Sequence, residues 1–233
     1  RTGAGKSSIL NCLFRIFDVS TGSVSLDGVD VRDMGLHKLR HSIAAILQDP
    51  VILSGTVRSN LDPFNEHNDV AIWDALASVQ LDDHVRSLGG LGVELGVGGD
   101  QFSAGQKQLL CYTRSLLQDT DVVMLDEATS SVDNGMDGLI QDSLRRGSGV
   151  GGMGSRTVLT IAHRLRTVMD YDMILVMADG CVESYGPPAV LLGLVESELG
   201  DAGVSPILSH FVGETGEEKE YLESMAMKAY SSS

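Results

Sequence analysis

The sequence predicts an α/β fold with a mainly parallel sheet, a short antiparallel hairpin and an inserted helical region. Short uninterrupted apolar runs are typical of strands buried on both faces of a parallel sheet. Runs of this kind, with Ser42, Thr157 and Thr160 as their polar members, occupy residues 42–47, 122–125 and 157–162, with segments of helical periodicity between them. Each run also ends in a polar side chain, which is the place where ligands bind in an open α/β sheet.

Size and charge narrow the possible functions. The 233 residues supply enough material for one large domain or two small ones. No apolar run reaches about 18 residues, so we expect no membrane-spanning segment in this stretch. The net charge of −15 argues against a broad nucleic-acid surface but allows a local site for a phosphorylated ligand. Because the chain begins at Arg1 without a signal pattern, we expect it to be an N-terminally truncated fragment.

The three cysteines are Cys12, Cys111 and Cys181. They are widely separated and show neither disulfide nor zinc spacing. We therefore expect buried thiols in a reducing compartment.

Residues 1–8 form a phosphate-binding pattern. They read Arg-Thr-Gly-Ala-Gly-Lys-Ser-Ser, and one glycine before Arg1 would complete G-x-x-x-x-G-K-[ST], the P-loop. Glycines let backbone N–H groups turn toward a phosphate, and the helix opening at Lys6 adds its positive end. Lys6 is expected to reach the β- and γ-phosphates, and the Ser7 hydroxyl to bind Mg²⁺. The phosphate-binding candidates are Thr2, Gly3, Ala4, Gly5, Lys6, Ser7 and Ser8.

A chance glycine-rich loop is the alternative interpretation of this pattern. The apolar residues that follow disfavour it, because they share one helical face, as the helix of a P-loop requires. They are Ile9, Leu10, Leu13, Phe14 and Phe17.

The strand ends supply further candidates. The run at 122–125 stops at two adjacent acids, Asp126 and Glu127, of which one can reach a metal and the other a water. The runs at 42–47 and 157–162 deliver Gln48 and His163. For each residue taken alone, a solvated strand end or a buried structural histidine is the simple alternative.

Residues 54–118 read as helices and loops. Asn68 or Asp69 is a candidate helix cap, and Trp73 is interpreted as packing rather than as a nucleotide-stacking residue. Ser103 and Gly105 lie at the start of a second amphipathic helix, which makes a second natural anion site. Taken alone, an N-cap serine and a loop glycine would explain them equally well.

Two hairpins and a tail complete the pattern. Asp27-Gly28 and Asp179-Gly180 each separate two short strand-like segments, which predicts antiparallel hairpins. Beyond residue 191 the sequence becomes acidic and loses clear periodicity, with a possible helix at 214–229.

In this order, the motifs resemble those of the nucleotide-binding domain of an ATP-binding cassette (ABC) transporter, over residues 1–192. Residues 3–7 resemble Walker A, Gln48 the Q-loop, and residues 102–106 the LSGGQ signature. Residues 122–126 resemble Walker B, residues 131–133 the D-loop with Asp133, and His163 the H-loop histidine. The resemblance implies a P-loop NTPase with a RecA/F1-like core and an α-helical subdomain.

The finer resemblance is to the second nucleotide-binding domain of the C subfamily, the multidrug-resistance-associated group. Residues 48–64 and 98–100 are similar to that group, and Glu127 stands where first domains often carry a poorer base. Phe102 departs from the usual leucine of the signature. The resemblance also implies an aromatic residue that stacks on adenine, which is expected upstream of Arg1.

The resemblance also implies roles. Lys6 and the loop amides would hold ATP, while Ser7, Gln48 and, through water, Asp126 would fix Mg²⁺. Glu127 would polarise the attacking water and His163 would hold the γ-phosphate. The signature residues would close over ATP held by a second nucleotide-binding domain in a head-to-tail sandwich. They are Ser103, Ala104, Gly105 and Gln106.

We expect four segments: the first part of the core at 1–53, a helical subdomain at 54–118, the second part of the core at 119–192, and an acidic tail at 193–233. The implied function is an ATPase that powers transmembrane export, located at the cytoplasmic face through transmembrane domains absent from this chain. A regulatory ATP-binding module is the main alternative, and a soluble ABC ATPase is a weaker one. No nucleic-acid partner is expected.

Overall fold

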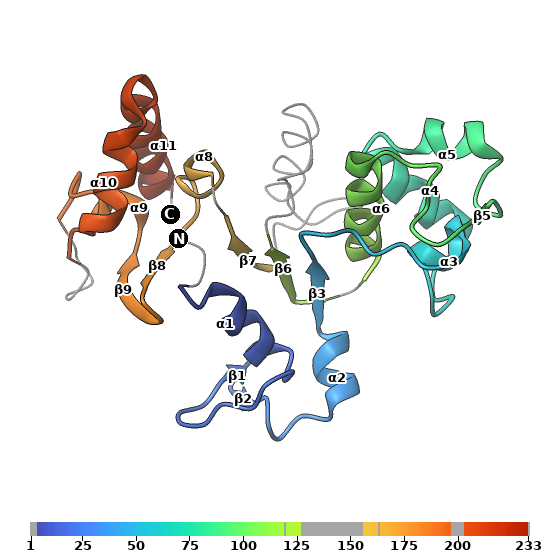
Figure 1. Ribbon diagram of the computed structural model, residues 1–233, viewed down its shortest axis with the longest axis horizontal. Helices are drawn as coiled ribbons and strands as arrows, with labels where there is room; N and C mark the ends of the chain where they lie inside the picture. Colours follow the sequence, from blue (N-terminus) through green and yellow to red (C-terminus); the bar gives the residue numbers. More distant parts are fainter. Residues whose placement is uncertain (1–3, 119, 127–155, 163, 197–202, 233) are drawn as a thin grey trace. The chain divides into compact units, whose positions relative to one another are not determined.

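A computed structural model describes residues 4–118, 120–126, 156–162, 164–196 and 203–232 (Figure 1). The chain divides into two compact units, one formed by residues 12–161 and the other by residues 1–11 together with 162–233.

A three-stranded parallel sheet lies in the unit formed by residues 12–161. Its order is β3 (Ile43–Ile46), β6 (Val122–Asp126) and β7 (Thr157–Ile161), side by side in Figure 1. Three strands were expected, and their apolar runs explain them. The prediction that all three are fully buried was wrong for the two end strands: Leu159 of β7 is 36% exposed, and Ala45 of β3 is exposed too.

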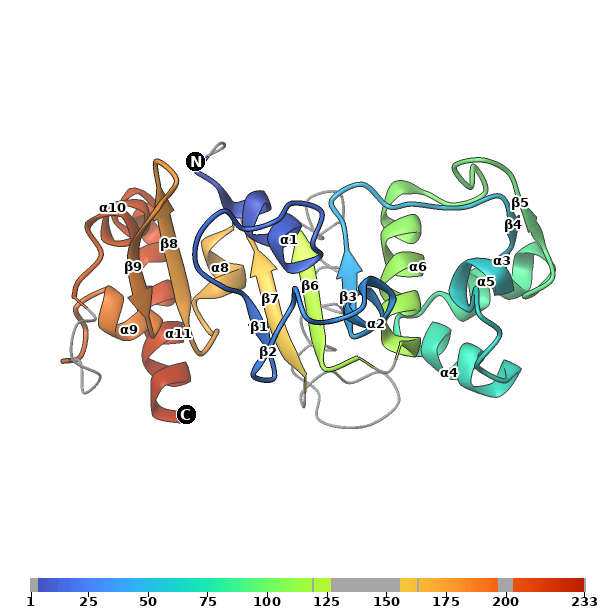
Figure 2. The same ribbon diagram turned by 90° about the horizontal axis from the view of Figure 1, so that it is seen from below.

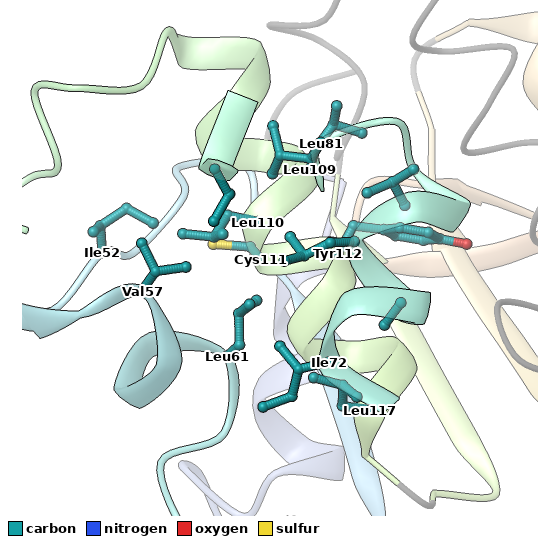
Figure 3. Close-up of a cluster of buried hydrophobic side chains, with 14 of the residues drawn as sticks. Ile52, Val57, Leu61, Ile72, Leu81, Leu109, Leu110, Cys111, Tyr112 and Leu117 are labelled. Carbon is teal, nitrogen blue, oxygen red and sulfur yellow. The ribbon is translucent and has the colours of Figure 1, made fainter. Parts of the chain in front are cut away.

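The same unit contains the helical region. Its helices are α3 (Val57–Leu61), α4 (Asp69–Ser78), α5 (Asp82–Leu88) and α6 (Ala104–Leu117). Side chains from these helices converge in one buried cluster, seen in Figure 3. Burial of apolar surface in this cluster stabilises the helices more than their own propensities do, because isolated helices of this length are marginal in water.

Local signals explain where these helices begin. The Asn68 side chain accepts a hydrogen bond from the Ala71 N–H at 2.9 Å, which confirms the predicted cap of α4. Trp73 packs against the buried cluster, and the Arg86 guanidinium lies 4.0 Å from its ring centroid, so the packing interpretation of Trp73 is confirmed. One feature was not predicted: β4 (Gly55–Thr56) pairs with β5 (Glu94–Leu95) across this region.

The segment before β3 forms a hairpin and two helices. β1 (Ser25–Leu26) pairs with β2 (Val29–Asp30) around Asp27 and Gly28, whose φ angles of 49° and 78° suit a tight hairpin turn. Helix α2 spans Leu36–His41.

Helix α1 spans Lys6–Leu13 and is shorter than predicted. Phe17, expected on its apolar face, is 59% exposed. The chain leaves the helix at Arg15, whose φ is 48° and whose guanidinium Nη1 donates to the carbonyl oxygens of Val31 (3.0 Å) and Met34 (2.8 Å).

The second unit contains an antiparallel hairpin and short helices, seen together in Figure 2. β8 (Ile174–Ala178) pairs with β9 (Cys181–Gly186), as predicted. The remaining elements are α8 (Leu165–Val168), α9 (Pro188–Leu191), α10 (Pro206–Glu214), the 3₁₀ turn η1 (Gly216–Glu218) and α11 (Lys219–Ser232).

The C-terminal helices belong to a buried core of this unit. Leu208, Val212 and Leu222 pack with Met169 and Leu191. The Ser205 side chain caps α10 by accepting from the Leu208 N–H at 3.1 Å, and its hydroxyl donates to Glu183 at 2.7 Å. The helix expected at 214–229 thus exists in part, as α11, and α10 precedes it.

Two further expectations concern the membrane and the thiols. Within the described ranges, no helix is both long and apolar enough to cross a bilayer. All three cysteines are free, but only Cys111 is buried, while Cys12 is half-buried and Cys181 is exposed. The expectation of three buried thiols was therefore wrong for two of them, because Cys12 and Cys181 lie at the end of a helix and the start of a hairpin strand.

Candidate functional site

The start of α1 is built around Gly5. Gly5 has a φ of +98°, and its carbonyl oxygen accepts from the Ser8 N–H at 3.1 Å and the Ile9 N–H at 3.3 Å, which opens the helix. A Cβ at this position would lie 3.3 Å from Cε of Met177 and 3.7 Å from Cα of Gly180, in the turn region of the β8–β9 hairpin. The backbone angle requires glycine at residue 5, and the Met177 methyl group would also have to move by a few tenths of an ångström to admit a Cβ.

The side chains after Gly5 suit a phosphate ligand. Ser7 and Ser8 are exposed at the positive end of α1, and Lys6 is half-buried beside them in sequence. Ala4 is buried, which anchors the chain just before the turn. Thr2 and Gly3, the other residues predicted for this loop, lie outside the described residues.

A second group of candidates lies at one edge of the parallel sheet. Parallel strands end at the same edge, and the register pairs Ile46 with Leu125 and Asp126 with Ile161. Gln48 follows β3 by two residues and is exposed, while Asp126 is the half-buried last residue of β6. β3 and β6 therefore end at the same edge of the sheet, where Asp126 lies and which the chain leaves just before Gln48.

Three further predicted residues, besides Thr2 and Gly3, lie outside the described residues. Glu127 follows Asp126 directly in the chain, and His163 comes two residues after β7. Asp133, predicted for the D-loop, also lies outside the described residues. Their roles stay predictions.

The start of α6 forms a complete capping box. The Ser103 hydroxyl accepts from the Gln106 N–H at 3.2 Å, and the Gln106 side chain accepts from the Ser103 N–H at 2.9 Å. Ala104 and Gly105 occupy the first turn, where amide groups have no acceptor within the helix. Ser103 is exposed, so this helix start is accessible to an anionic ligand.

The loop before Ser103 has support that sequence reasoning missed. Phe102 is 3% exposed, and the His84 ring packs edge-on against it with centroids 5.2 Å apart. His84 Nε2 also lies 3.2 Å from the Gln101 carbonyl oxygen, and the Gln101 side chain donates to the Glu94 carbonyl at 3.2 Å. Phe102 therefore fills an apolar site beneath the signature, as a leucine could.

Sequence reasoning also missed the residues that hold the segment after β3. Gln108, Cys111 and Arg114 of α6 all donate hydrogen bonds to backbone carbonyl groups between Leu47 and Asn60. The sequence contained one signal for these contacts: Gln108 interrupts the apolar positions of an amphipathic helix.

The residues predicted for Mg²⁺ suit that ion chemically. Mg²⁺ prefers oxygen ligands and keeps several waters and substrate phosphate oxygens in its shell. Ser7, Gln48 and Asp126 offer a hydroxyl, a carboxamide and a carboxylate oxygen, so their donor set fits. Over the part of the chain that the structure describes, no group of three His, Cys, Asp or Glu residues could hold a metal by itself.

Comparisons with known proteins agree with these features. The family model "ABC transporter" matches residues 1–130. The chain is 47% identical over 193 residues to ATP-binding cassette sub-family C member 2 of Rattus norvegicus, covering 82% of this chain and 12% of that protein. It is 43% identical over 194 residues to metal resistance protein YCF1 of Saccharomyces cerevisiae, covering 82% and 12%.

Comparison with a solved structure supports the same family. The chain is similar to "Structure of a bacterial Atm1-family ABC exporter with ATP bound", with a TM-score of 0.79 and 28% identity over 93% of this chain and 36% of that chain. The chain thus spans only 12–13% of the length of its first curated relatives. With the glycine-dependent start of α1, the shared sheet edge and the capped start of α6, these matches show that the chain belongs to the ABC transporter family, as an ATP-binding domain with the P-loop NTPase fold and with C-subfamily proteins among its relatives.

Proposed function

We propose that this chain is the ATP-hydrolysing domain that powers export by a membrane transporter of the C-subfamily type. The observation that carries the proposal is the strand register, which ends β3 and β6 at one sheet edge, with Asp126 at that edge and Gln48 and Glu127 just beyond it in the chain. Phosphoryl transfer needs positioning and charge stabilisation more than covalent chemistry, and a strand edge supplies fixed positions.

The chain's own residues then divide the work. The backbone amides after Gly5 and the Lys6 ammonium bind and orient the phosphates of ATP. Ser7 and Gln48 would provide oxygen ligands for Mg²⁺, and Asp126 would hold it through water. The bound ion would supply neutralisation of the charge on the transferred phosphoryl group. Glu127 orients the attacking water and accepts its proton, and His163 holds the γ-phosphate.

The second ATP contact would come from a partner domain. An exposed helix start at Ser103, Ala104 and Gly105, with Gln106 completing the cap, is suited to phosphate. We propose that these residues, and Asp133 of the D-loop, face ATP held by a second nucleotide-binding domain. Glu127 favours the second domain of a C-subfamily protein over the first. The work would take place at the cytoplasmic face, beside the transmembrane domains.

The test is ATP hydrolysis by the full-length protein in membranes, with Glu127→Gln. Turnover should fall by about 10²–10³-fold while ATP binding persists, because a carboxamide cannot accept the proton. Asp121→Asn is a matched control at the opposite end of β6, where the side chain is exposed and the backbone carbonyl accepts from the Thr157 N–H. Turnover should then stay near the unsubstituted level.

If Glu127→Gln leaves turnover unchanged, the partner site does the hydrolysis. This chain would then act as a regulatory ATP-binding module, the alternative predicted from the sequence.

A further inference from the structure

We propose that Gln108 is a positioning residue for Gln48: its carboxamide fixes the point at which the chain leaves the sheet, and it does so from the helix that carries the signature. The proposal rests on the proposed function, since it assigns Gln48 to the Mg²⁺ site. It begins from a buried polar side chain in an otherwise apolar part of α6. Gln108 is 1% exposed, and its Nε2 donates to the Leu47 carbonyl oxygen at 2.9 Å.

The position of that hydrogen bond is informative. β3 stays paired with β6 up to Ile46 opposite Leu125, and then its ladder ends, although β6 continues to Asp126 beside β7. Leu47 is the next residue, and its carbonyl bonds to Gln108 of α6. The Gln108 carboxamide therefore takes the place of a strand partner at Leu47, which the register sets opposite Asp126 and which lies one residue before Gln48.

Neighbouring residues of α6 continue this contact along the segment after β3. Residues 108, 111 and 114 share a helix face because they are three apart. The Cys111 thiol donates to the Val51 carbonyl at 3.6 Å, and Arg114 Nη2 donates to the same oxygen at 3.2 Å. Figure 3 shows the Cys111 sulfur on the side of α6 that faces Ile52 and Val57.

The far end of the segment is fixed as well. Asn60 of α3 bonds to both the N–H and the carbonyl of Leu53, each at 2.8 Å, and Arg114 Nε donates to the Asn60 carbonyl at 2.6 Å. The backbone on both sides of exposed Gln48 is thus attached to one helix. Since the N-cap of that helix is Ser103, a shift of α6 on ligand binding at the signature would move the Leu47 peptide and with it Gln48.

A purely structural role explains Gln108 poorly. Its Oε1 is buried and has no hydrogen-bond partner among the residues that the structure describes. An unpaired buried oxygen destabilises a fold, and a side chain selected for packing alone would be apolar there. Methionine has nearly the same volume and lacks both the donor and the unpaired oxygen.

The experiment is Gln108→Met in the full-length transporter, in the Glu127→Gln background, so that no readout depends on hydrolysis. Two quantities are measured: the Mg²⁺ concentration that gives half-maximal retention of ATP, and hydrogen exchange of amides 47–53. We expect the Mg²⁺ requirement to rise by about five- to tenfold and exchange in 47–53 to speed up by a similar factor, the worth of one hydrogen bond. Thermal stability should be unchanged, because the unpaired oxygen is removed too.

Thr113→Val is the matched control. Thr113 is fully buried in the same helix, but its hydroxyl donates to the Leu109 carbonyl within α6. It should leave the Mg²⁺ requirement unchanged. An equal shift in both variants, or a Gln108→Met variant that loses thermal stability with no change in Mg²⁺ requirement, overturns the proposal.

A second variant tests the proposal if Gln108→Met folds poorly. In Gln108→Glu, the carboxyl group can donate to the Leu47 carbonyl only when protonated, so the defect in Mg²⁺ requirement should be larger at about pH 8 than at about pH 6. A defect that does not vary with pH contradicts the proposal. Failure of the proposed function would appear separately, as full turnover in Glu127→Gln alone.

Discussion

The two helix starts that the sequence marks as anion sites, those of α1 and α6, are built in opposite ways. α1 opens after Gly5, where a positive φ disfavours any side chain and a Cβ would lie 3.3 Å from Cε of Met177. α6 opens at Ser103, whose side chain forms a reciprocal pair of hydrogen bonds with Gln106. A bare backbone suits a loop that wraps a ligand in its own domain, whereas a side-chain cap makes a helix start that is stable before any ligand arrives.

The largest difference between the two starts should appear with Lys6→Ala. α1 depends on a long cation to reach the phosphates, and we expect turnover of the full-length protein to fall by about 10²–10³-fold. Lys107→Ala is the corresponding change in α6, where the lysine lies one residue after the capping box. We expect it to reduce turnover less. ATPase assays in membranes measure both, and equal losses would mean that the two starts do not differ in this way.

Gly5→Ala should have the next largest effect. It forces a side chain into a left-handed backbone conformation, which costs about 1–2 kcal/mol. The measured quantities are ATP affinity and hydrogen exchange in α1 of the full-length protein, and we expect weaker binding and faster exchange. Gly35→Ala is a control, because Gly35 has a φ of −62° and open space around its Cβ position. If Gly5→Ala binds ATP normally, the loop does not require glycine there.

The features that the sequence predicted depend on contacts between residues that are close together in the chain. Gly5, Ser103 and Asn68 act through neighbours within four residues, so spacing and residue type were sufficient to predict these helix starts. Strand ends were also predictable, because apolar runs stop abruptly. The sheet edge near Gln48 and Asp126 was predictable because ligands bind beyond the carboxyl ends of parallel strands.

What the sequence did not predict depends on contacts between distant residues. Helix α1 ends early, and Arg15, which follows it, donates hydrogen bonds to Val31 and Met34, 16 and 19 positions further along the chain. Hydrophobic periodicity does not predict contacts over such separations. The Gln108–Leu47 bond joins residues 61 apart. Helix α10 was missed because its apolar residues read as an irregular tail until they pack with Met169 and Leu191.

Ser103→Ala should destabilise α6 locally. Loss of an N-cap side chain costs about 1 kcal/mol, which corresponds to roughly fivefold faster exchange of amides in the first turn of α6. Hydrogen exchange in the full-length protein without nucleotide measures this cost separately from any effect on ATP. Ser8→Ala is the comparison in α1, where the serine lies in the first turn after Gly5 and we expect less change. Equal changes would remove the distinction between a side-chain cap and a backbone cap.

Gln106→Met should have a smaller effect than Ser103→Ala. It removes the acceptor of the Ser103 N–H but keeps the Ser103 cap itself, and the freed N–H can bond to water because Ser103 is exposed. We expect about 0.5 kcal/mol, seen as exchange of the Ser103 amide with little change in later amides. A loss as large as that of Ser103→Ala would show that the two halves of the box act as one unit.

Acid pH should destabilise the loop at residues 62–67 but not the start of α6 in the same unit. Burial alone would raise the pKa of Asp62, but hydrogen bonds from the backbone N–H groups of Glu66 and His67 outweigh it, so the pKa lies below its ordinary 3.8. A lowered carboxylate pKa stabilises the fold above the unfolded value, and the contribution is lost as pH falls through the folded one. Protection of residues 62–67 should therefore decline between about pH 5 and about pH 3. The capping box contains only a hydroxyl and a carboxamide, so the start of α6 should keep its protection over the same range, and a parallel decline would mean that its stability comes from the surrounding loops.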